Sequence, residues 1–272
     1  MSARNRFASA LVLALIVGTG HAAEPLRTDH LSSQLVAETR QAVRGQTLRL
    51  GLHLQHDPNW HTYWRNPGDS GLPTRIALSL PDGVDAGDIQ WPAPQRFELS
   101  GIVNFGYDER IVLPLEIRLP ADLPGESLEI EARASWLICA AECIPGRGEY
   151  RLSLPLADAA EADPRWREDF ARAQARQPSK LHADARYRVD GERVLVELRG
   201  DALPPAIAGW EVFPVTTQLV ANAAWPTWSR IAGGFRLALP RSEYFVAAPQ
   251  RFELLLVQDE RALAIDAAHT AP

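Results

Sequence analysis

The sequence is poor in sulfur and in lysine. Its 272 residues include two cysteines and one methionine, and Lys180 is the only lysine. Two cysteines are too few for a scaffold stapled by several disulfides, and a single methionine excludes a methionine-rich copper(I) site. The net charge of -6 argues against a polyanion such as nucleic acid as the partner. No apolar run beyond the N-terminus reaches the roughly 18 residues that a membrane-spanning helix needs, which predicts a soluble chain.

The first 23 residues have the order of a secretory signal peptide. Arg4 and Arg6 precede an apolar stretch at residues 7–17, and residues 20–23 include the small residues Gly20, Ala22 and Ala23 where a signal peptidase would cut. The apolar stretch is too short to span a membrane. We therefore expect residues 1–23 to be removed and the mature chain to enter an oxidising compartment, where the two cysteines are able to bond.

Period-two alternation of apolar and polar residues dominates from about Thr47 to Leu156. The runs are short and end at proline, glycine, aspartate or asparagine, which is typical of antiparallel strands with one buried face. This pattern of short alternating strands favours an immunoglobulin-like β-sandwich over a parallel sheet with crossover helices. The expected inward faces are Leu48, Leu50, Leu52 and Leu54; Ile76, Leu78 and Leu80; Ile111 to Leu119 at alternate positions; Leu128 to Trp136 at alternate positions; and Tyr150, Leu152 and Leu154.

One convincing helix is predicted at residues 164–176. Asp163 is placed as the N-cap, Pro164 as the first helical residue, and Pro178 follows the end. Apolar side chains at helical spacing predict that this connector docks against a neighbouring domain; they are Trp166, Phe170 and Ala173.

Strand patterns resume after Lys180, with a hairpin signal at Asp190 and Gly191. The predicted fold class is all-β, with two immunoglobulin-like β-sandwich domains joined by a short helix. The heptamer APQRFEL occurs at residues 93–99 and again at 248–254, which suggests that one sandwich domain is a duplicate of the other. The residues that flank the two copies align poorly. The expected division is a signal peptide at 1–23, a first domain at 24–160, a helical connector at 161–180 and a second domain at 181–272.

Cys139 and Cys143 are the most informative residues. In an extended strand their Cα atoms would lie about 13 Å apart, whereas a disulfide needs less than about 7 Å, so the segment must turn, for example as a helical turn. A bond that closes so small a loop is a poor structural staple, which favours redox use. Against this, Glu142 between the cysteines would raise a thiol pKa, and no basic residue lies in the motif. A redox pair, a passive disulfide and a metal site all stay open on spacing alone.

Histidines and aromatic residues cluster before and within a tryptophan-rich segment. His53, His56 and His61 could join the cysteines in a copper or zinc site, but solvated or turn-bound histidines are the simpler interpretation. His53 shares the parity of exposed positions. Tyr63 and the tryptophans near it could form a ligand platform, although core or rim packing is favoured.

A family resemblance rests on five segments of the sequence. They are PNWHTYWRNPGDSGLP at residues 58–73, QWPAP at 90–94, FGY at 105–107, WLIC at 136–139 and CIP at 143–145. Together they resemble the N-terminal periplasmic domain of the thiol:disulfide interchange protein DsbD family, and most closely the branch found in suppressor-of-copper-sensitivity protein B. The resemblance covers about residues 30–160, and the second domain fits that branch more loosely.

The resemblance implies a periplasmic, immunoglobulin-like protein-disulfide reductase component without a cofactor. Cys139 and Cys143 would carry electrons from a membrane-embedded thiol-disulfide transporter to oxidised periplasmic proteins. An aromatic loop shields the pair in better-known members; the matching positions are Phe105, Gly106 and Tyr107, with Phe97 as a further candidate. The cysteines are more closely spaced here, and the chain ends where a membrane domain and a thioredoxin-like domain would follow, so the donor would be a separate polypeptide. The alternatives are a non-enzymatic binding module with an inert disulfide and a copper-tolerance protein that binds metal.

Overall fold

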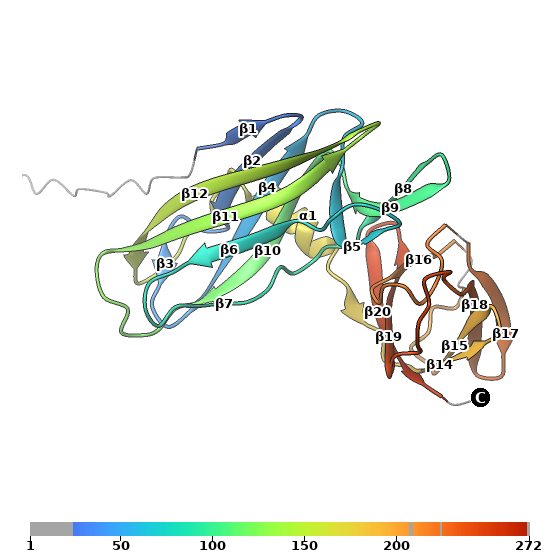
Figure 1. Cartoon of the computed structure of the whole chain (residues 1–272). Coiled ribbons are helices and arrows are strands. Elements are labelled where there is room, and N and C mark those ends of the chain that lie inside the picture. The colour runs from blue at the N-terminus through green and yellow to red at the C-terminus, as the bar shows by residue number, and fades with distance from the viewer. Residues whose placement is uncertain (1–23, 207–208, 224, 271–272) are drawn as a thin grey trace, which may run out of the picture.

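The computed structural model describes residues 24–206, 209–223 and 225–270. The expected signal peptide, residues 1–23, lies outside this part of the chain. The chain forms two β units, and one helix lies alongside the first unit and leads into the second (Figure 1). The predicted class, an all-β protein with two immunoglobulin-like units and a short helix between them, is confirmed. Within the described residues, no helix is long and apolar enough to cross a membrane.

The first unit is a sandwich of two sheets with a small third sheet at one end. One main sheet has the order β1 (Leu26–Thr28), β2 (Leu31–Ala37), β4 (Thr47–His56), β10 (Arg110–Arg118) and β7 (Asp85–Ala86). The other has the order β3 (Ala42–Val43), β12 (Cys143–Ala157), β11 (Ser127–Cys139) and β6 (Arg75–Ser79). The small sheet has the order β5 (Thr62–Gly68), β9 (Ile102–Tyr107) and β8 (Gln95–Leu99).

The predicted inward faces form the core of this sandwich. Leu50, Leu52 and Leu54 of β4 are fully buried, and Leu113 of β10 lies opposite Leu52 in the antiparallel register. The opposing sheet contributes the alternate residues of β11 and β12, beginning with Leu128. The period-two pattern therefore predicted correctly which side of each long strand faces the core of the sandwich.

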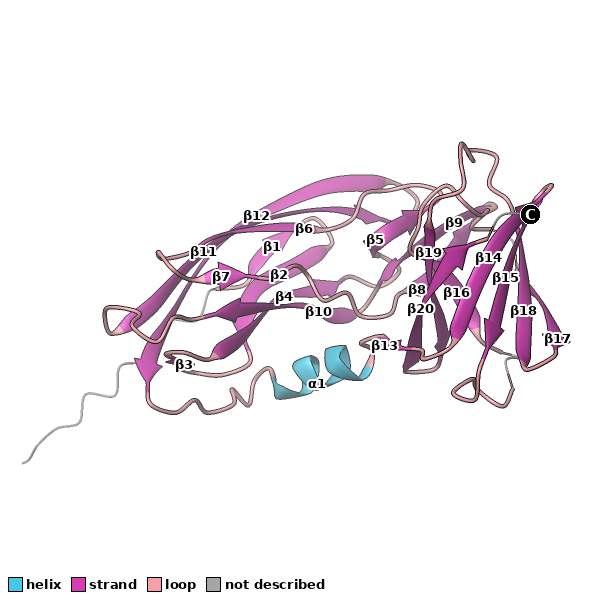
Figure 2. Ribbon diagram, turned by 90° about the horizontal axis from the view of Figure 1, so that it is seen from below, coloured by secondary structure: helices cyan, strands magenta, loops and turns pink. Residues whose placement is uncertain are grey.

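The helix α1 (Arg167–Ala175) is shorter than predicted. Residues 164–166 form a turn ahead of it, in which the Asp163 carboxylate accepts the Arg165 backbone N–H at 3.0 Å and the Asp163 carbonyl accepts the Arg167 N–H at 3.1 Å, the contacts expected of a capping residue. The predicted docking is confirmed: Phe170 and Ala173 pack on Val36 of β2 and Val112 of β10. Figure 2 shows the helix running alongside the first unit. This contact covers the outer face of the sheet, so β4 and β10 are buried on both sides.

The second unit is one continuous sheet that encloses a core of its own. The Asp190 and Gly191 hairpin signal is confirmed, since the two strands around it pair in antiparallel register. The order is β16 (Glu211–Pro214), β19 (Arg251–Gln258), β20 (Arg261–His269), β14 (Asp184–Asp190), β15 (Arg193–Arg199), β18 (Gly234–Pro240) and β17 (Thr227–Ile231), with β13 (Ser179–Lys180) added beside β20.

The repeated heptamer occupies two different environments. Its first copy runs into β8, the edge strand of the small sheet, where Phe97 is partly exposed. Its second copy runs into β19, which lies between β16 and β20, and there Phe252 is fully buried. The two copies therefore do not hold equivalent structural positions.

The two units share an apolar contact at the end where the small sheet lies. Phe213 of β16 enters the core of the first unit and meets the Phe105 ring edge-on, with 5.2 Å between ring centroids. The Asn66 amide donates a hydrogen bond of 2.7 Å to the Pro214 carbonyl. The second unit is thus anchored next to β5, β8 and β9.

Candidate functional site

The two cysteines form a disulfide at the tip of the long hairpin made by β11 and β12. Cys139 ends β11, Cys143 begins β12, and the two are directly opposite in register with 4.2 Å between their Cα atoms. The helical turn offered by the sequence is wrong, because residues 140–142 form a hairpin turn instead. The pairing of the two strands alone brings the cysteines within bonding distance.

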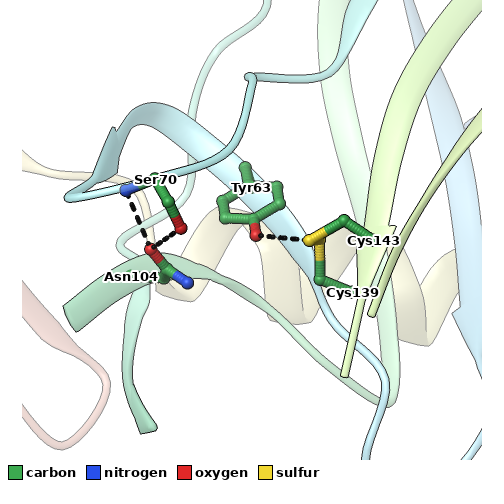
Figure 3. Close-up of a disulfide and its surroundings, with 5 residues drawn as sticks. All are labelled: Tyr63, Ser70, Asn104, Cys139 and Cys143. Carbon is green, nitrogen blue, oxygen red and sulfur yellow. Dashed lines mark hydrogen bonds between the residues drawn. A yellow bond between two sulfur atoms is a disulfide. The ribbon is translucent and has the colours of Figure 1, made fainter. Parts of the chain in front are cut away.

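The two halves of the disulfide have different exposures. Cys139 is 1% exposed, and its backbone exchanges both hydrogen bonds with His61, at 3.0 and 2.9 Å. Cys143 is exposed, and its Sγ lies 3.6 Å from the hydroxyl of Tyr63. Figure 3 shows the Tyr63 hydroxyl directed at this sulfur. One sulfur-bearing residue is therefore held inside the fold while the other faces solvent.

The disulfide opens onto a cavity of about 710 Å³. One wall is the segment before and at the start of β5, a second is the hairpin turn that carries the disulfide, and a third is formed by β8 and β9. We call the hairpin of β8 and β9, residues 95–107, the cap hairpin. Its Phe97 ring stacks on the His61 ring, with 4.4 Å between centroids and 10° between planes. Leu99 and Ile102, 59% and 48% exposed, complete the apolar rim.

The predicted cover residues separate into two groups. Phe97 lies at the cavity, whereas Phe105 and Tyr107 do not line it, because both are fully buried in the core of the first unit. The Tyr107 hydroxyl donates to the Pro92 carbonyl at 2.6 Å, and burial holds its pKa well above the ordinary value. Gly106 faces β5 and allows the two strands to approach. The alternation of β9 turns its aromatic residues inward, so the aromatic side chain at the cavity comes from the neighbouring strand β8.

Sequence reasoning did not assign His61 and Tyr63 to the disulfide. The sequence offers His61 as a metal ligand and Tyr63 as a packing residue, yet both line the cavity and their rings meet edge-on at 5.2 Å. Their spacing of two residues on a strand, which puts both side chains on one face, was the available signal. The sequence does not show that this face meets Cys139, since the contact joins strands far apart in the chain.

Burial sets the charge state of the groups around the disulfide. It lowers the pKa of His61 from 6.5, with Asp108 acting weakly in the opposite direction. It raises the pKa of Tyr63 above 10.0, so the phenol keeps its proton at neutral pH and is available as a donor. Arg96 also lines the cavity; burial lowers its pKa from 12.5, and it remains a cation.

The three histidines do not converge. His53 lies under α1 beside Asp169, and His56 bonds the Glu109 carbonyl and the Thr62 hydroxyl. The exposed parity expected for His53 is wrong, because α1 covers that face of β4. Among the residues that the structure describes, no group of three or more histidine, cysteine, aspartate or glutamate side chains is arranged to hold a metal ion.

Comparisons with known proteins give a matching family model and a solved structure of the same fold. Residues 32–155 match the family model described as thiol:disulfide interchange protein DsbD, N-terminal. The N-terminal periplasmic domain of ScsB from Proteus mirabilis matches with a TM-score of 0.65 at 20% identity, covering 91% of this chain and 98% of that one. A chimeric titin Z1Z2 with a KLER peptide from decorin covers 93% and 100% at 10% identity, with a TM-score of 0.20. No curated protein matches the chain. The match to the ScsB domain extends over both β units and concerns their fold.

Proposed function

Residues 32–155 belong to the DsbD N-terminal family, and from this premise we propose that the chain is a periplasmic thiol-disulfide exchange protein. It acts as a reductant that takes electrons from a membrane-embedded dithiol and passes them to oxidised periplasmic proteins. The observation that carries the proposal is the Cys139–Cys143 disulfide at a hairpin tip, with one cysteine exposed beside an apolar cavity. Residues 1–23 serve as the export signal, residues 24–160 as the exchange domain, and residues 181–272 as a second domain joined through the connector at 161–180.

The position of the disulfide supports a redox role over a structural one. β11 and β12 are paired along the whole length from Ser127 to Cys139, so the hairpin does not depend on the bond at its tip. A bond that closes a loop this short also removes little entropy from the unfolded chain. Its reduction therefore leaves the fold in place, which an electron carrier needs.

The unequal exposure supports an order of attack for the two sulfurs. The reduced Cys143 thiolate, which faces solvent, attacks one sulfur of the partner's disulfide and forms a mixed disulfide, while the partner's other sulfur leaves as a thiolate. The buried Cys139 then attacks Cys143 and releases the partner's first sulfur. The partner gains two electrons, and the cysteine pair loses two.

The cap hairpin supports exchange with folded partners. Its Leu99 and Ile102 are large apolar side chains exposed beside the disulfide, and an exposed apolar rim is typical of a protein-binding surface. The Phe97 ring packed on His61 narrows the approach to the buried Cys139 side of the disulfide while no partner is bound. Access by a small reductant to that side of the bond is expected to require movement of this hairpin.

The test is the redox equilibrium of the mature chain against a glutathione series, read by thiol alkylation and mass. A midpoint between about -120 and -270 mV, the range of known exchange proteins, is the expected result. A pair that stays oxidised across the series, as a structural disulfide below about -300 mV would, overturns the proposal and leaves a binding module with an inert bond.

Two matched variants then test the order of attack. Cys139→Ser keeps the exposed thiol and is expected to accumulate mixed disulfides with an oxidised protein substrate. Cys143→Ser keeps only the buried thiol and is expected to trap little. Equal trapping by both variants would contradict the assigned order.

A further inference from the structure

Three side chains form a row across the strands at the site. Cys139 lies directly opposite Cys143 on one side and directly opposite His61 on the other. Residues directly opposite in antiparallel strands carry their side chains on the same face, with Cβ atoms about 4.5–5.5 Å apart. The His61 ring and the two sulfurs therefore belong to one face, and all three residues line the same cavity.

The His61 ring carries a polar atom that nothing satisfies. His61 is 8% exposed, and its Nε2 is fully buried without a hydrogen-bond partner among the described residues. A buried group of this kind destabilises the fold, and its presence calls for an explanation such as a catalytic role. The packing at this point does not need a nitrogen, because the stack on Phe97 would form equally well with a phenylalanine ring.

We propose that His61 accepts the thiol proton of Cys139 when Cys139 resolves the mixed disulfide at Cys143. This inference rests on the proposed function and concerns its second step. The proton moves from the Cys139 sulfur to Nε2 of His61, the Cys139–Cys143 bond forms, and the bond between Cys143 and the partner breaks. The partner's sulfur leaves with the electron pair of the broken bond and takes up the proton that His61 releases.

The surroundings of His61 keep its imidazole neutral and therefore able to accept a proton. Burial lowers the pKa of His61, and only Asp108 raises it. The other titratable or charged groups facing it are Tyr63 on its own strand, which stays protonated, and Arg96 and Glu98 on the cap hairpin. At neutral pH the ring is thus a free base next to a buried thiol, and Cys139 has no basic residue near it in sequence.

The experiment mixes the fully reduced mature chain with 5,5′-dithiobis(2-nitrobenzoate) in a stopped-flow instrument. The first release of thionitrobenzoate reports attack on the reagent, and the second reports resolution by Cys139. Cys139→Ser fixes the assignment, because it gives only the first release. His61→Phe keeps the ring that stacks on Phe97, and His61→Gln keeps polarity at the same place. His30→Gln is the matched control, since His30 also stacks on an aromatic ring, Trp60 at 3.9 Å, but does not line the cavity.

The expected signature is a change in pH dependence. In the wild-type chain the second release is nearly independent of pH between the pKa of His61 and that of the thiol. In both His61 variants the rate of the second release becomes proportional to the fraction of Cys139 present as thiolate, so it rises about tenfold per pH unit. Near pH 6.5 this rate is about 100-fold lower than in wild type. His30→Gln retains the wild-type plateau.

Failure of this inference differs from failure of the proposed function. His61 variants that retain the wild-type plateau and rate overturn the role of His61 and leave its ring as packing, while both releases still demonstrate exchange. A wild-type chain that gives no second release, or that stays oxidised against glutathione, overturns the proposed function itself.

Discussion

The hydroxyl of Tyr63 lies 3.6 Å from Sγ of Cys143 and joins the start of β5 to the start of β12. The turn after β5 holds this ring in place, because a side chain at Gly71 would meet the Tyr63 ring at 2.2 Å. Ser70 in the same turn bonds Asn104 of the cap hairpin, as Figure 3 shows. The GDSG segment at residues 68–71 is therefore a support for Tyr63.

Replacing Tyr63 by phenylalanine tests whether this hydroxyl stabilises the Cys143 thiolate. The phenol stays protonated and can donate to the reduced sulfur, so its loss is expected to raise the pKa of the Cys143 thiol by about 1 unit. Iodoacetamide alkylation of the Cys139→Ser background at a series of pH values measures that pKa. Tyr150→Phe is the control, because its hydroxyl is also bonded, to Ser33, but away from the cavity. An unchanged thiol pKa in Tyr63→Phe would count against the role.

Arg96 ties the cap hairpin to the second unit. Its guanidinium donates a hydrogen bond of 2.9 Å to the Asn222 carbonyl and lies over the Trp225 ring, 4.9 Å from the ring centroid. The Asn222 side-chain amide donates a hydrogen bond of 2.9 Å to the Asp69 carboxylate, which also accepts a hydrogen bond from the backbone N–H of Val103. A single loop of the second unit thus holds both the cap hairpin and the turn beside it.

Breaking this tie is expected to loosen the cap. Arg96→Ala removes the hydrogen bond to the Asn222 carbonyl, and Asn222→Ala removes the one from its amide to Asp69. Each bond is worth about 1 kcal/mol or more, so amide exchange in β8 and reduction of the disulfide by dithiothreitol should accelerate about fivefold to tenfold. Mass-detected hydrogen exchange and a reduction time course measure the two effects. Arg230→Ala is the matched control, since that guanidinium lies over Phe235 within the second unit. Acceleration in the control to the same degree would assign the effect to general destabilisation.

His56 predicts acid sensitivity of the first unit. Its Nδ1 donates to the Glu109 carbonyl, its Nε2 accepts from the Thr62 hydroxyl, and burial lowers its pKa from 6.5 to about 4. In the unfolded chain the His56 ring is protonated below about pH 6.5, whereas in the folded chain it is protonated only below about pH 4. This group's stabilising effect is present above pH 6.5 and falls by about 3 kcal/mol as the pH approaches 4.

Urea unfolding at pH 7 and at pH 4.5 measures this loss. His56→Gln is expected to be less stable than wild type at pH 7 but to lose less stability on acidification. His182→Gln, at an exposed position of the second unit, serves as the control. The pKa values of His53 and His61 are also lowered by burial, so every variant is expected to lose some stability on acidification through these two residues. An identical pH dependence in wild type and His56→Gln would refute the assignment.

Strand faces could be predicted from the sequence because they depend on local alternation. Leu50, Leu52 and Leu54 needed only a period of two to be placed in the core. His53 could not be placed in the same way, since its burial depends on α1, which packs on β4 from more than a hundred residues further along the chain.

The site was predicted only in part for a related reason. Cys139 and Cys143 are close in sequence, so their bond was foreseeable, although the strand register that makes it a hairpin bond was not. The resemblance offers Phe105, Gly106 and Tyr107 as the cover, with Phe97 as a further candidate, and of these four only Phe97 lines the cavity. His61 reaches the disulfide only through a pairing across the fold, which no local pattern encodes.

Gly106 offers the sharpest test of how the small sheet positions the site. It lies between Tyr63 and Gln95 in the sheet, and a Cβ there would come within 1.9 Å of the Thr62 carbonyl oxygen. Gly106→Ala must therefore push β9 away from β5 and displace the cap hairpin. We expect a loss of about 1–3 kcal/mol in stability to urea, together with faster reduction of the disulfide.

Gly87→Ala separates this close approach from the general effect of replacing glycine. Its added Cβ would lie 3.7 Å from the nearest atom, the Glu116 carbonyl oxygen, which is ordinary contact. This variant should be as stable as wild type or slightly more so, because alanine restricts the unfolded chain. If Gly106→Ala matched Gly87→Ala in urea stability and in reduction rate, the close approach of β5 and β9 would not be what holds the cap hairpin over the disulfide.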